Sequence, residues 1–173
     1  DAELIVHAPE LFERDHLLDL TSPDKKYRNL SIEHLQKTID VCNHLKRFFN
    51  NRRSNIGVVT NVGGFSEEFR LDDSTCARRI DNFRDSLSKL DLCGIEILPQ
   101  TMPPFPWLLG GQRIHNLFTD PGKIKAFCQE ESMRICLDVS HSSLFCNCNG
   151  QSLDEFLEEV LPYTVHLHLA DAS

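Results

Sequence analysis

The sequence lacks several features that define common protein classes. No apolar run approaches the roughly 18 residues of a transmembrane helix, and we expect neither a membrane span nor a secretory leader. No GxGxxG motif precedes the first predicted helix, which disfavours a nucleotide-binding doubly wound fold. Basic side chains are few, with 18 against 26 acidic ones and a net charge of -8. Nucleic acid is therefore disfavoured as a partner, because phosphate binding needs clustered Lys and Arg.

Paired cysteine motifs for metal binding are also missing. The seven cysteines are an odd number, and most fall inside apolar helix or strand patterns, where a cysteine behaves as a small core residue. The closest pair, Cys146 and Cys148, has no second CxxC to complete a zinc knuckle. We therefore expect reduced thiols and a cytoplasmic protein.

The chain is long enough for one domain, which we expect to span residues 1–173. Apolar residues recur at gaps of three and four along four predicted helices, and short apolar runs between them predict strands. Alternating strands and helices are typical of an α/β fold with a parallel sheet. The predicted strands cover residues 4–7, 56–64, 93–98, 135–139 and 164–171, the helices begin at Ser31, near Asp72, at Asp120 and at Ser152, and residues 8–30 and 146–150 are predicted to be loops.

The stretch RICLDVSH, residues 134–141, is the most informative part of the chain. Residues 135–139 form an apolar run that Asp138 alone interrupts, which predicts a strand buried on both faces. A buried carboxylate is costly unless it is paired or binds a metal. His141 follows where the strand would leave the sheet. An acid at the end of a buried strand, with an imidazole just beyond it, predicts an active site.

The other strands carry polar side chains at similar places. Alternate residues of a strand point to opposite faces, and His7, Glu96 and His168 lie near the carboxyl ends of their strands, opposite an aliphatic face. In a parallel barrel these ends meet at one rim. We therefore expect all three side chains to converge with Asp138.

Two histidines and two carboxylates suit a divalent metal such as zinc, manganese, cobalt or magnesium. Taken singly, each histidine has a simpler interpretation as a satisfied core or surface side chain. His166 lies two residues deeper than His168, and it either binds substrate or hydrogen-bonds a neighbour. The histidines at positions 16, 34, 44 and 115 are predicted to lie in loops or helices without a functional role.

Four motifs together resemble a known family: HAPE at residues 7–10, the glutamate in IEILP, the acid and histidine in LDVSH, and HLHLAD. They are similar to motifs of the xylose-isomerase-like TIM barrels, which include sugar-phosphate isomerases and epimerases and the endonuclease IV type of abasic-site nuclease. The resemblance implies a (β/α)8 barrel of which this chain supplies about strands two to six, because a complete barrel needs roughly 250 residues. GGQRIHNLF and HLHLAD also resemble barrels attached to nonulosonic (sialic-type) acid synthases.

The resemblance implies roles for individual residues. Glu96 matches a metal ligand that can also serve as a base. Asp138 and His168 match further metal ligands, and His7 is assigned to the same metal. His141 matches a neighbouring histidine that acts on metal or substrate, and it is counted with Glu96 as catalytic.

Two other positions are assigned to the substrate. Thr60-Asn61 stand where the nucleases have a histidine, which removes a zinc ligand, and Asn61 is assigned to substrate binding instead. Arg113 lies in the long loop after the third strand. Either this residue or the backbone N–H groups of Gly63-Gly64 are assigned to a substrate phosphate, with a solvated arginine and a plain turn as the alternatives. The resemblance places a closing glutamate beyond Ser173.

The leading interpretation is an enzyme, a divalent-metal-dependent isomerase or epimerase acting on a sugar or sugar phosphate. Glu96, or the glutamate that the resemblance places beyond Ser173, would move a proton beside a metal-polarised carbonyl, and His141 would bind a hydroxyl. The first alternative is a noncatalytic barrel that binds a sugar or scaffolds a synthase, and the second is an abasic-site nuclease. Five parallel strands leave two open edges, which further residues, a second copy or a synthase domain would cover.

Overall fold

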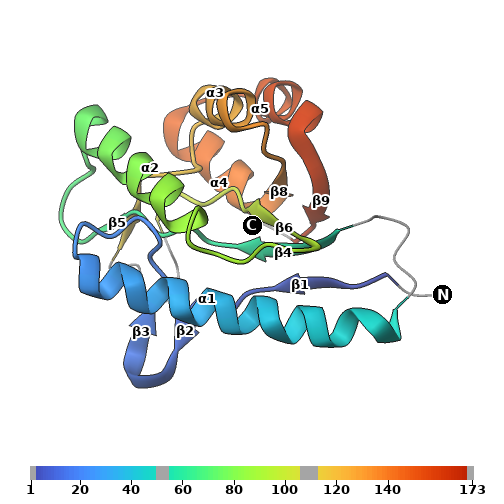
Figure 1. The fold of residues 1–173 in the computed structure, drawn as a ribbon. Coiled ribbons are helices and arrows are strands. Elements are labelled where there is room, and N and C mark those ends of the chain that lie inside the picture. Colours follow the sequence, from blue (N-terminus) through green and yellow to red (C-terminus); the bar gives the residue numbers. More distant parts are fainter. Residues whose placement is uncertain (1–2, 50–54, 106–112, 171–173) are drawn as a thin grey trace. The chain divides into compact units, whose positions relative to one another are not determined.

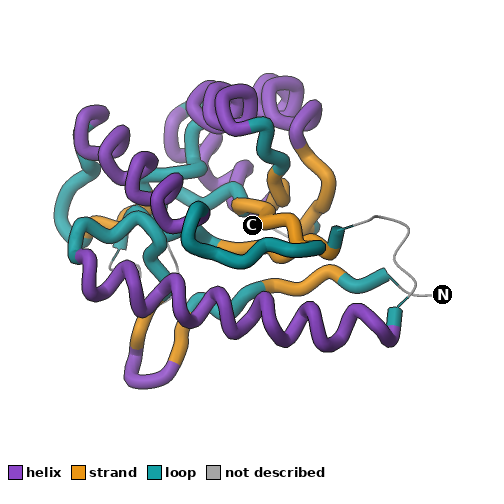
Figure 2. The backbone as a smooth tube through the Cα atoms, in the orientation of Figure 1, coloured by secondary structure: helices purple, strands orange, loops and turns teal. Residues whose placement is uncertain are grey.

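Strands and helices alternate along the chain in the computed structural model, which describes residues 3–49, 55–105 and 113–170 (Figures 1 and 2). The fold is α/β, as predicted. The structure divides into two units, one formed by residues 1–63 and 77–98 and the other by residues 64–76 and 99–173. Each unit is described by itself.

The first unit is built on a three-stranded sheet. Its strands are β1 (Ile5–His7), β4 (Ile56–Thr60) and β6 (Ile95–Pro99), in the order β1-β4-β6. β1 and β4 are parallel, with Val6 opposite Val58. Every residue of β4 is buried, as expected for the middle strand of a covered sheet. The first three predicted strands are thus confirmed.

The first helix, α1 (Lys25–Leu45), begins six residues before the predicted start at Ser31. Asp24 is the N-cap, and its carboxylate accepts hydrogen bonds from the backbone N–H groups of Lys26 and Tyr27. The prediction was wrong because residues 25–31 contain one aliphatic side chain, Leu30, so the apolar stripe that begins at Ile32 does not mark the start. α1 is followed by a 3-10 turn, η2 (Lys46–Phe48).

Residues 8–30 are more ordered than the predicted loop. β2 (Leu11–Phe12) and β3 (His16–Leu17) form a short antiparallel hairpin around a 3-10 turn, η1 (Glu13–Asp15). His16 therefore lies in a strand and is buried, where its ring hydrogen-bonds the hydroxyl of Ser31. Strands of two residues leave no alternating pattern in a sequence, which explains why the prediction missed them.

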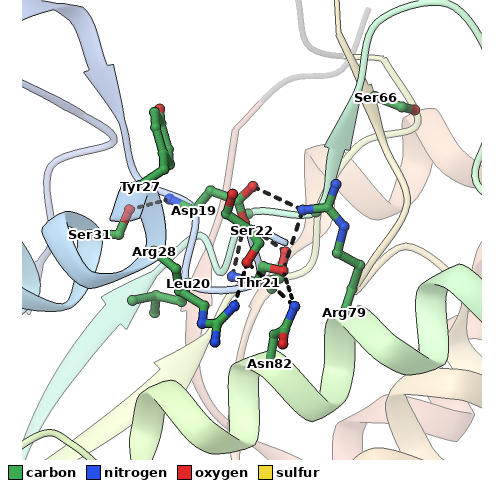
Figure 3. A network of polar contacts seen from close by, with 12 residues as sticks. Asp19, Leu20, Thr21, Ser22, Tyr27, Arg28, Ser31, Ser66, Arg79 and Asn82 are labelled. Atoms are coloured by element: carbon green, nitrogen blue, oxygen red, sulfur yellow. Dashed lines mark hydrogen bonds and ion pairs between the residues drawn. The ribbon is translucent and has the colours of Figure 1, made fainter. Parts of the chain in front are cut away.

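A buried polar network joins the loop after β3 to helix α2 (Asp73–Leu87) (Figure 3). We call it the Asp19 network. Asp19 accepts hydrogen bonds from the backbone and hydroxyl of Thr21 at 2.9 and 2.6 Å, and it faces Arg79 at 3.4 Å. Gly63 packs directly on Asp19, and a Cβ there would lie 2.1 Å from the carboxylate. Its other members are Ser22, Arg28 and Asn82.

Three predicted helix starts are confirmed by their caps. Asp72 accepts a hydrogen bond from the backbone of Thr75 at the start of α2. Asp120 caps α3 (Pro121–Glu131), with proline at its first position. Ser152 caps α5 (Leu153–Val160), which a 3-10 turn, η4 (Leu161–Tyr163), follows. Caps are local in sequence, so these boundaries could be predicted.

The second unit is centred on two parallel strands, β8 (Ile135–Asp138) and β9 (Thr164–His168). Both strands were predicted. The register places Cys136 opposite His166 and Asp138 opposite His168. These four side chains therefore share one face of the strand pair.

A helix that the sequence did not predict follows β8 at once. α4 (Val139–Asn149) occupies part of the predicted loop, and Gly150 ends it with a left-handed φ of +66°. Its buried positions are Ser140, Ser142, Phe145 and Cys146. This mixed stripe of hydroxyls and small side chains carries no apolar periodicity, so the helix was missed.

Two strands of two residues each form another short two-stranded sheet. β5 (Phe65–Ser66) and β7 (Ile114–His115) are antiparallel, with Phe65 opposite His115. The side chain of Asn116 donates hydrogen bonds to Gly64 O and Ser66 Oγ, each at 2.9 Å. The prediction that His115 lies in a loop or helix is therefore wrong.

Two further expectations concern the whole chain. Among the described residues, no helix is both long and apolar enough to cross a membrane. All seven cysteines lie in the described ranges, and none of them forms a disulfide.

Candidate functional site

Asp138 ends β8 and also caps α4. Its Oδ1 accepts hydrogen bonds from the hydroxyl of Ser140 at 2.7 Å and from the backbone N–H of His141 at 2.9 Å. The residue is 6% exposed. A buried carboxylate is tolerable here because it accepts several hydrogen bonds and lies at the positive end of a helix. These two hydrogen bonds fix the position of Oδ1, and the second carboxylate oxygen, Oδ2, takes no part in them.

The second oxygen faces two histidines. Asp138 Oδ2 lies 3.6 Å from Nδ1 of His168 and 3.7 Å from Nδ1 of His141, and the amide of Gln100 donates to it at 3.2 Å. His168 comes from β9 and His141 from the first turn of α4. The structure therefore brings together three of the predicted site residues within one unit.

A backbone carbonyl orients the ring of His141. Its Nδ1 lies 2.9 Å from the carbonyl oxygen of Thr101, which can only accept a hydrogen bond. The amide nitrogen of Gln100 lies 3.2 Å from the same Nδ1. The shorter contact with the carbonyl favours the tautomer that carries hydrogen on Nδ1 and leaves Nε2 as the basic nitrogen. This tautomer suits a histidine that accepts a hydrogen bond from a substrate hydroxyl.

Gln100 and Thr101 were missed by the sequence analysis. Gln100 forms an isolated parallel bridge with Cys136, and Thr101 N donates to Cys136 O at 3.0 Å. The Thr101 hydroxyl accepts from Asp138 N at 2.9 Å and donates to Asp138 O at 3.2 Å. Both residues hold the end of β8 in place. We call Gln100, Thr101, Asp138, His141 and His168 the Asp138 group.

Cys136 was also missed, because a cysteine inside an apolar strand is typical of a core residue. Its Sγ, one ring nitrogen of His166 and one ring nitrogen of His168 all lie within 4.8 Å of one another. The rings of His166 and His168 meet edge to face, with centroids 5.1 Å apart. Burial, with the neighbouring carboxylate of Asp138, raises the pKa of the Cys136 thiol to about 12. These three side chains form a cluster of metal-ligating type.

His115 is a buried histidine with an unusual environment. It is 3% exposed, packs edge to face on Phe65, and has no hydrogen-bond partner at Nδ1 within the described part of the chain. Burial first, and then the nearby His141, lower the pKa of His115 to about 4. The ring is therefore neutral at physiological pH. No sequence pattern marks it, because its strand is only two residues long.

Three predicted site residues belong to the first unit. Glu96 is half-buried in β6, between the buried Ile95 and Ile97. His7 ends β1 with an exposed side chain whose Nδ1 lies 2.8 Å from the carbonyl of the next residue. Asn61 is buried and accepts a hydrogen bond from Gly63 N at 2.9 Å. Their convergence with Asp138 stays a prediction.

Arg113 lies just before β7 in the second unit. Its guanidinium is 3.7 Å from the carboxylate of Glu67 and 6.0 Å from the ring centre of Phe65. The side chain is 36% exposed, and that of Glu67 is 75% exposed. An exposed arginine with a weak ion pair can exchange that partner for an anionic ligand.

The Asp138 group fits the divalent metal that the sequence predicts. Donors bound to one ion are typically about 3 Å apart, since metal–ligand distances are near 2.1 Å. The 3.6 Å between Asp138 Oδ2 and His168 Nδ1 is close to that spacing. The two side chains together offer one oxygen and one nitrogen, a donor set that suits manganese, cobalt or zinc.

Three solved structures are similar to this chain. A D-tagatose 3-epimerase-like protein gives a TM-score of 0.67 at 22% identity, covering 99% of this chain and 57% of that chain. A 3-keto-D-glucoside 4-epimerase from E. coli gives 0.62 at 13% identity, covering 89% and 55%. An L-ribulose 3-epimerase gives 0.61 at 15% identity, covering 90% and 47%. At these identities the likeness shows the fold, and the chain spans about half the length of each structure.

The comparisons agree on the fold class. A search of curated proteins found no match. The solved structures and the family model both support part of a TIM barrel, as the sequence predicted. Because the family model covers residues 1–173, the chain belongs to the family of xylose isomerase-like TIM barrels.

Proposed function

We propose that the protein is a divalent-metal-dependent isomerase or epimerase that acts on a sugar or sugar phosphate. The observation that carries the proposal is the Asp138 carboxylate, which is buried at a strand end with imidazoles 3.6 and 3.7 Å from one oxygen. Membership of the family and the likeness to three sugar epimerases support the same class of substrate.

Asp138 and His168 would hold the metal, and we include Glu96 and His7 on the sequence resemblance. When bound, the ion would polarise a carbonyl and the adjacent hydroxyl of the sugar. The position of Asp138 is fixed before binding, because Ser140 and the start of α4 hold its other oxygen. Such preorganisation limits the cost of arranging ligands around an ion.

The remaining residues would bind the sugar and move a proton. His141 presents Nε2 as an acceptor for a substrate hydroxyl, because Thr101 holds Nδ1. His166, Asn61 and Arg113 are the other residues that we assign to the substrate. Glu96 would take the proton from the carbon next to the carbonyl. Return of a proton to the former carbonyl carbon would isomerise the sugar, and return to the same carbon from the opposite face, by the glutamate that the sequence resemblance places beyond Ser173, would epimerise it, in both cases without net oxidation.

Proton exchange is the direct test of this reaction. The purified protein, loaded with Mn2+, would be incubated in D2O with a panel of ketoses and their phosphates. We expect deuterium to enter the carbon beside the carbonyl of at least one sugar, followed by NMR. The matched control is Asp138→Asn, which keeps the shape of the carboxylate and should abolish exchange.

The same experiment separates the alternatives. A folded protein that binds a sugar but neither retains metal nor exchanges a proton would be a noncatalytic or scaffolding barrel. Nicking of abasic DNA by the metal-loaded protein would favour a nuclease. Exchange that persists unchanged in Asp138→Asn would contradict the assigned site.

A further inference from the structure

The proposed reaction uses His166 and His168 but has no role for Cys136, which clusters with them. Their donor atoms lie within 4.8 Å of one another. The arrangement follows from the register of the two strands, because Cys136 is directly opposite His166 and His168 is two residues further along β9. On one face of a strand pair, directly opposed and diagonal side chains reach each other.

The donors of this cluster differ from those of the Asp138 group. Cys136 supplies sulfur and the two histidines supply imidazole nitrogen, a set that selects zinc and similar soft or borderline ions. Carboxylate oxygen, as in Asp138, suits manganese and magnesium better. Zinc–sulfur and zinc–nitrogen distances of about 2.3 and 2.0 Å need donors roughly 3.5 Å apart, so modest side-chain rotations would close the cluster around an ion.

We propose that Cys136, His166 and His168 bind Zn2+, and that this ion takes His168 away from Asp138. On binding, the Cys136 thiol gives its proton to water, and the thiolate sulfur forms the bond to zinc. Three protein ligands leave a fourth position for water. Zinc binding is independent of the proposed function, whereas its consequence for turnover rests on it.

Competition follows because the two positions share a ligand. A neutral imidazole offers a single lone pair, so His168 serves one ion at a time. Asp138 Oδ2 is 3.6 Å from His168 Nδ1, yet Asp138 is not one of the three clustered donors within the described chain. Zinc in the cluster would therefore exclude a catalytic ion held by Asp138 and His168.

Cobalt gives a spectroscopic test that needs no turnover. Co2+ replaces Zn2+ in such sites, and a cysteine ligand adds a sulfur-to-cobalt charge-transfer band in the near ultraviolet. We expect the metal-free protein to show this band with Co2+, and one equivalent of Zn2+ to remove it. Cys136→Ala should lose the band and weaken Zn2+ binding at least about 100-fold. This decrease in affinity is larger than the one caused by removing a side chain that only hydrogen-bonds a metal ligand.

A matched control uses another buried thiol. Cys128 on α3 is 2% exposed and lies outside the cluster, so Cys128→Ala should keep the band. Circular dichroism would check folding. If Cys136→Ala does not fold, His166→Gln provides the second variant, and it should lower Zn2+ affinity at least about 10-fold.

The outcomes separate this proposal from the proposed reaction. Asp138→Asn should keep the charge-transfer band while losing proton exchange. A folded wild-type protein without the band, or a band that persists in Cys136→Ala, would overturn the zinc site whatever the activity. If Co2+ gives the band and Zn2+ removes it, but Zn2+ leaves Mn2+-dependent exchange unaffected, the shared use of His168 is wrong.

Discussion

Two buried carboxylates in this protein have opposite surroundings. Asp19 faces Arg79 and accepts two hydrogen bonds from Thr21. Asp138 faces the imidazoles of His141 and His168. Both acids are nearly inaccessible, at 8% and 6% exposed. Burial and hydrogen bonding alone therefore do not distinguish the acid of the Asp19 network from the acid of the candidate site.

The side chains that face each carboxylate distinguish the two acids. A guanidinium is always charged and binds no metal, so the Asp19 network can only hold the loop after β3 against α2. Imidazoles ligate metals and can donate or accept a hydrogen bond, so the Asp138 group can take part in a reaction. The cluster containing Cys136 adds further atoms of metal-ligating type.

The largest effect should come from Asp138→Asn. Proton exchange should fall about 10³-fold, on the scale of losing a group that stabilises charge in a transition state, which corresponds to about 4 kcal/mol. The asparagine oxygen can still cap α4, so urea unfolding should change little. Activity and unfolding would be measured on the same preparation, and a variant that keeps turnover would remove Asp138 from the site.

Asp19→Ala should show the reverse pattern. Arg79 would lose its carboxylate inside the protein, and the free energy of unfolding should fall by about 3 kcal/mol. Turnover per folded molecule should stay unchanged. The control is Asp81→Ala, which breaks an exposed ion pair with Arg84 and should cost less than about 0.5 kcal/mol. Equal losses in the two variants would contradict a structural role for the Asp19 network.

Sequence reasoning predicted the strand with Asp138 because a lone carboxylate in an apolar run is a strong signal. It also predicted that His168 shares a face with it, since strands alternate with a period of two. These expectations are confirmed by the register of β8 and β9. The placement of Glu96 and His7 near the same acid depended on a closed barrel and stays a prediction.

Other parts of the site could not be predicted, for identifiable reasons. Gln100 and Thr101 reach Asp138 through pairing with a strand distant in sequence, and nothing local marks such pairing. α4 was missed because its buried face carries serines. Cys136 was classed with the core because buried cysteines usually are core residues. In each case tertiary contacts, and not local pattern, determine the role.

His115→Gln tests the neighbourhood of the Asp138 group at lower pH. The pKa of His115 is lowered to about 4 from an ordinary 6.5. Between these two pH values the unfolded chain binds a proton at this residue and the folded protein does not. Stability is full above about pH 6.5 and falls as the pH drops towards 4, by about 2 kcal/mol at pH 5. The His115→Gln variant should lack this decrease, which would be measured as the difference between the free energies of unfolding in urea at pH 7 and at pH 5. The control variant His44→Gln, at an exposed position, should still show the decrease.

Arg113→Gln should have the smallest effect and extends the comparison to an exposed cation. Unlike Arg79, Arg113 is 36% exposed and lies 3.7 Å from a still more exposed acid, so its loss should leave unfolding unchanged. If it binds a substrate phosphate, KM for a phosphorylated sugar should rise about 10-fold, or about 1.4 kcal/mol, with kcat retained. KM for the unphosphorylated sugar should not change. An equal rise in KM for both sugars would show that Arg113 does not recognise phosphate. A decrease in the free energy of unfolding comparable to that of Asp19→Ala would show that this arginine, too, is structural.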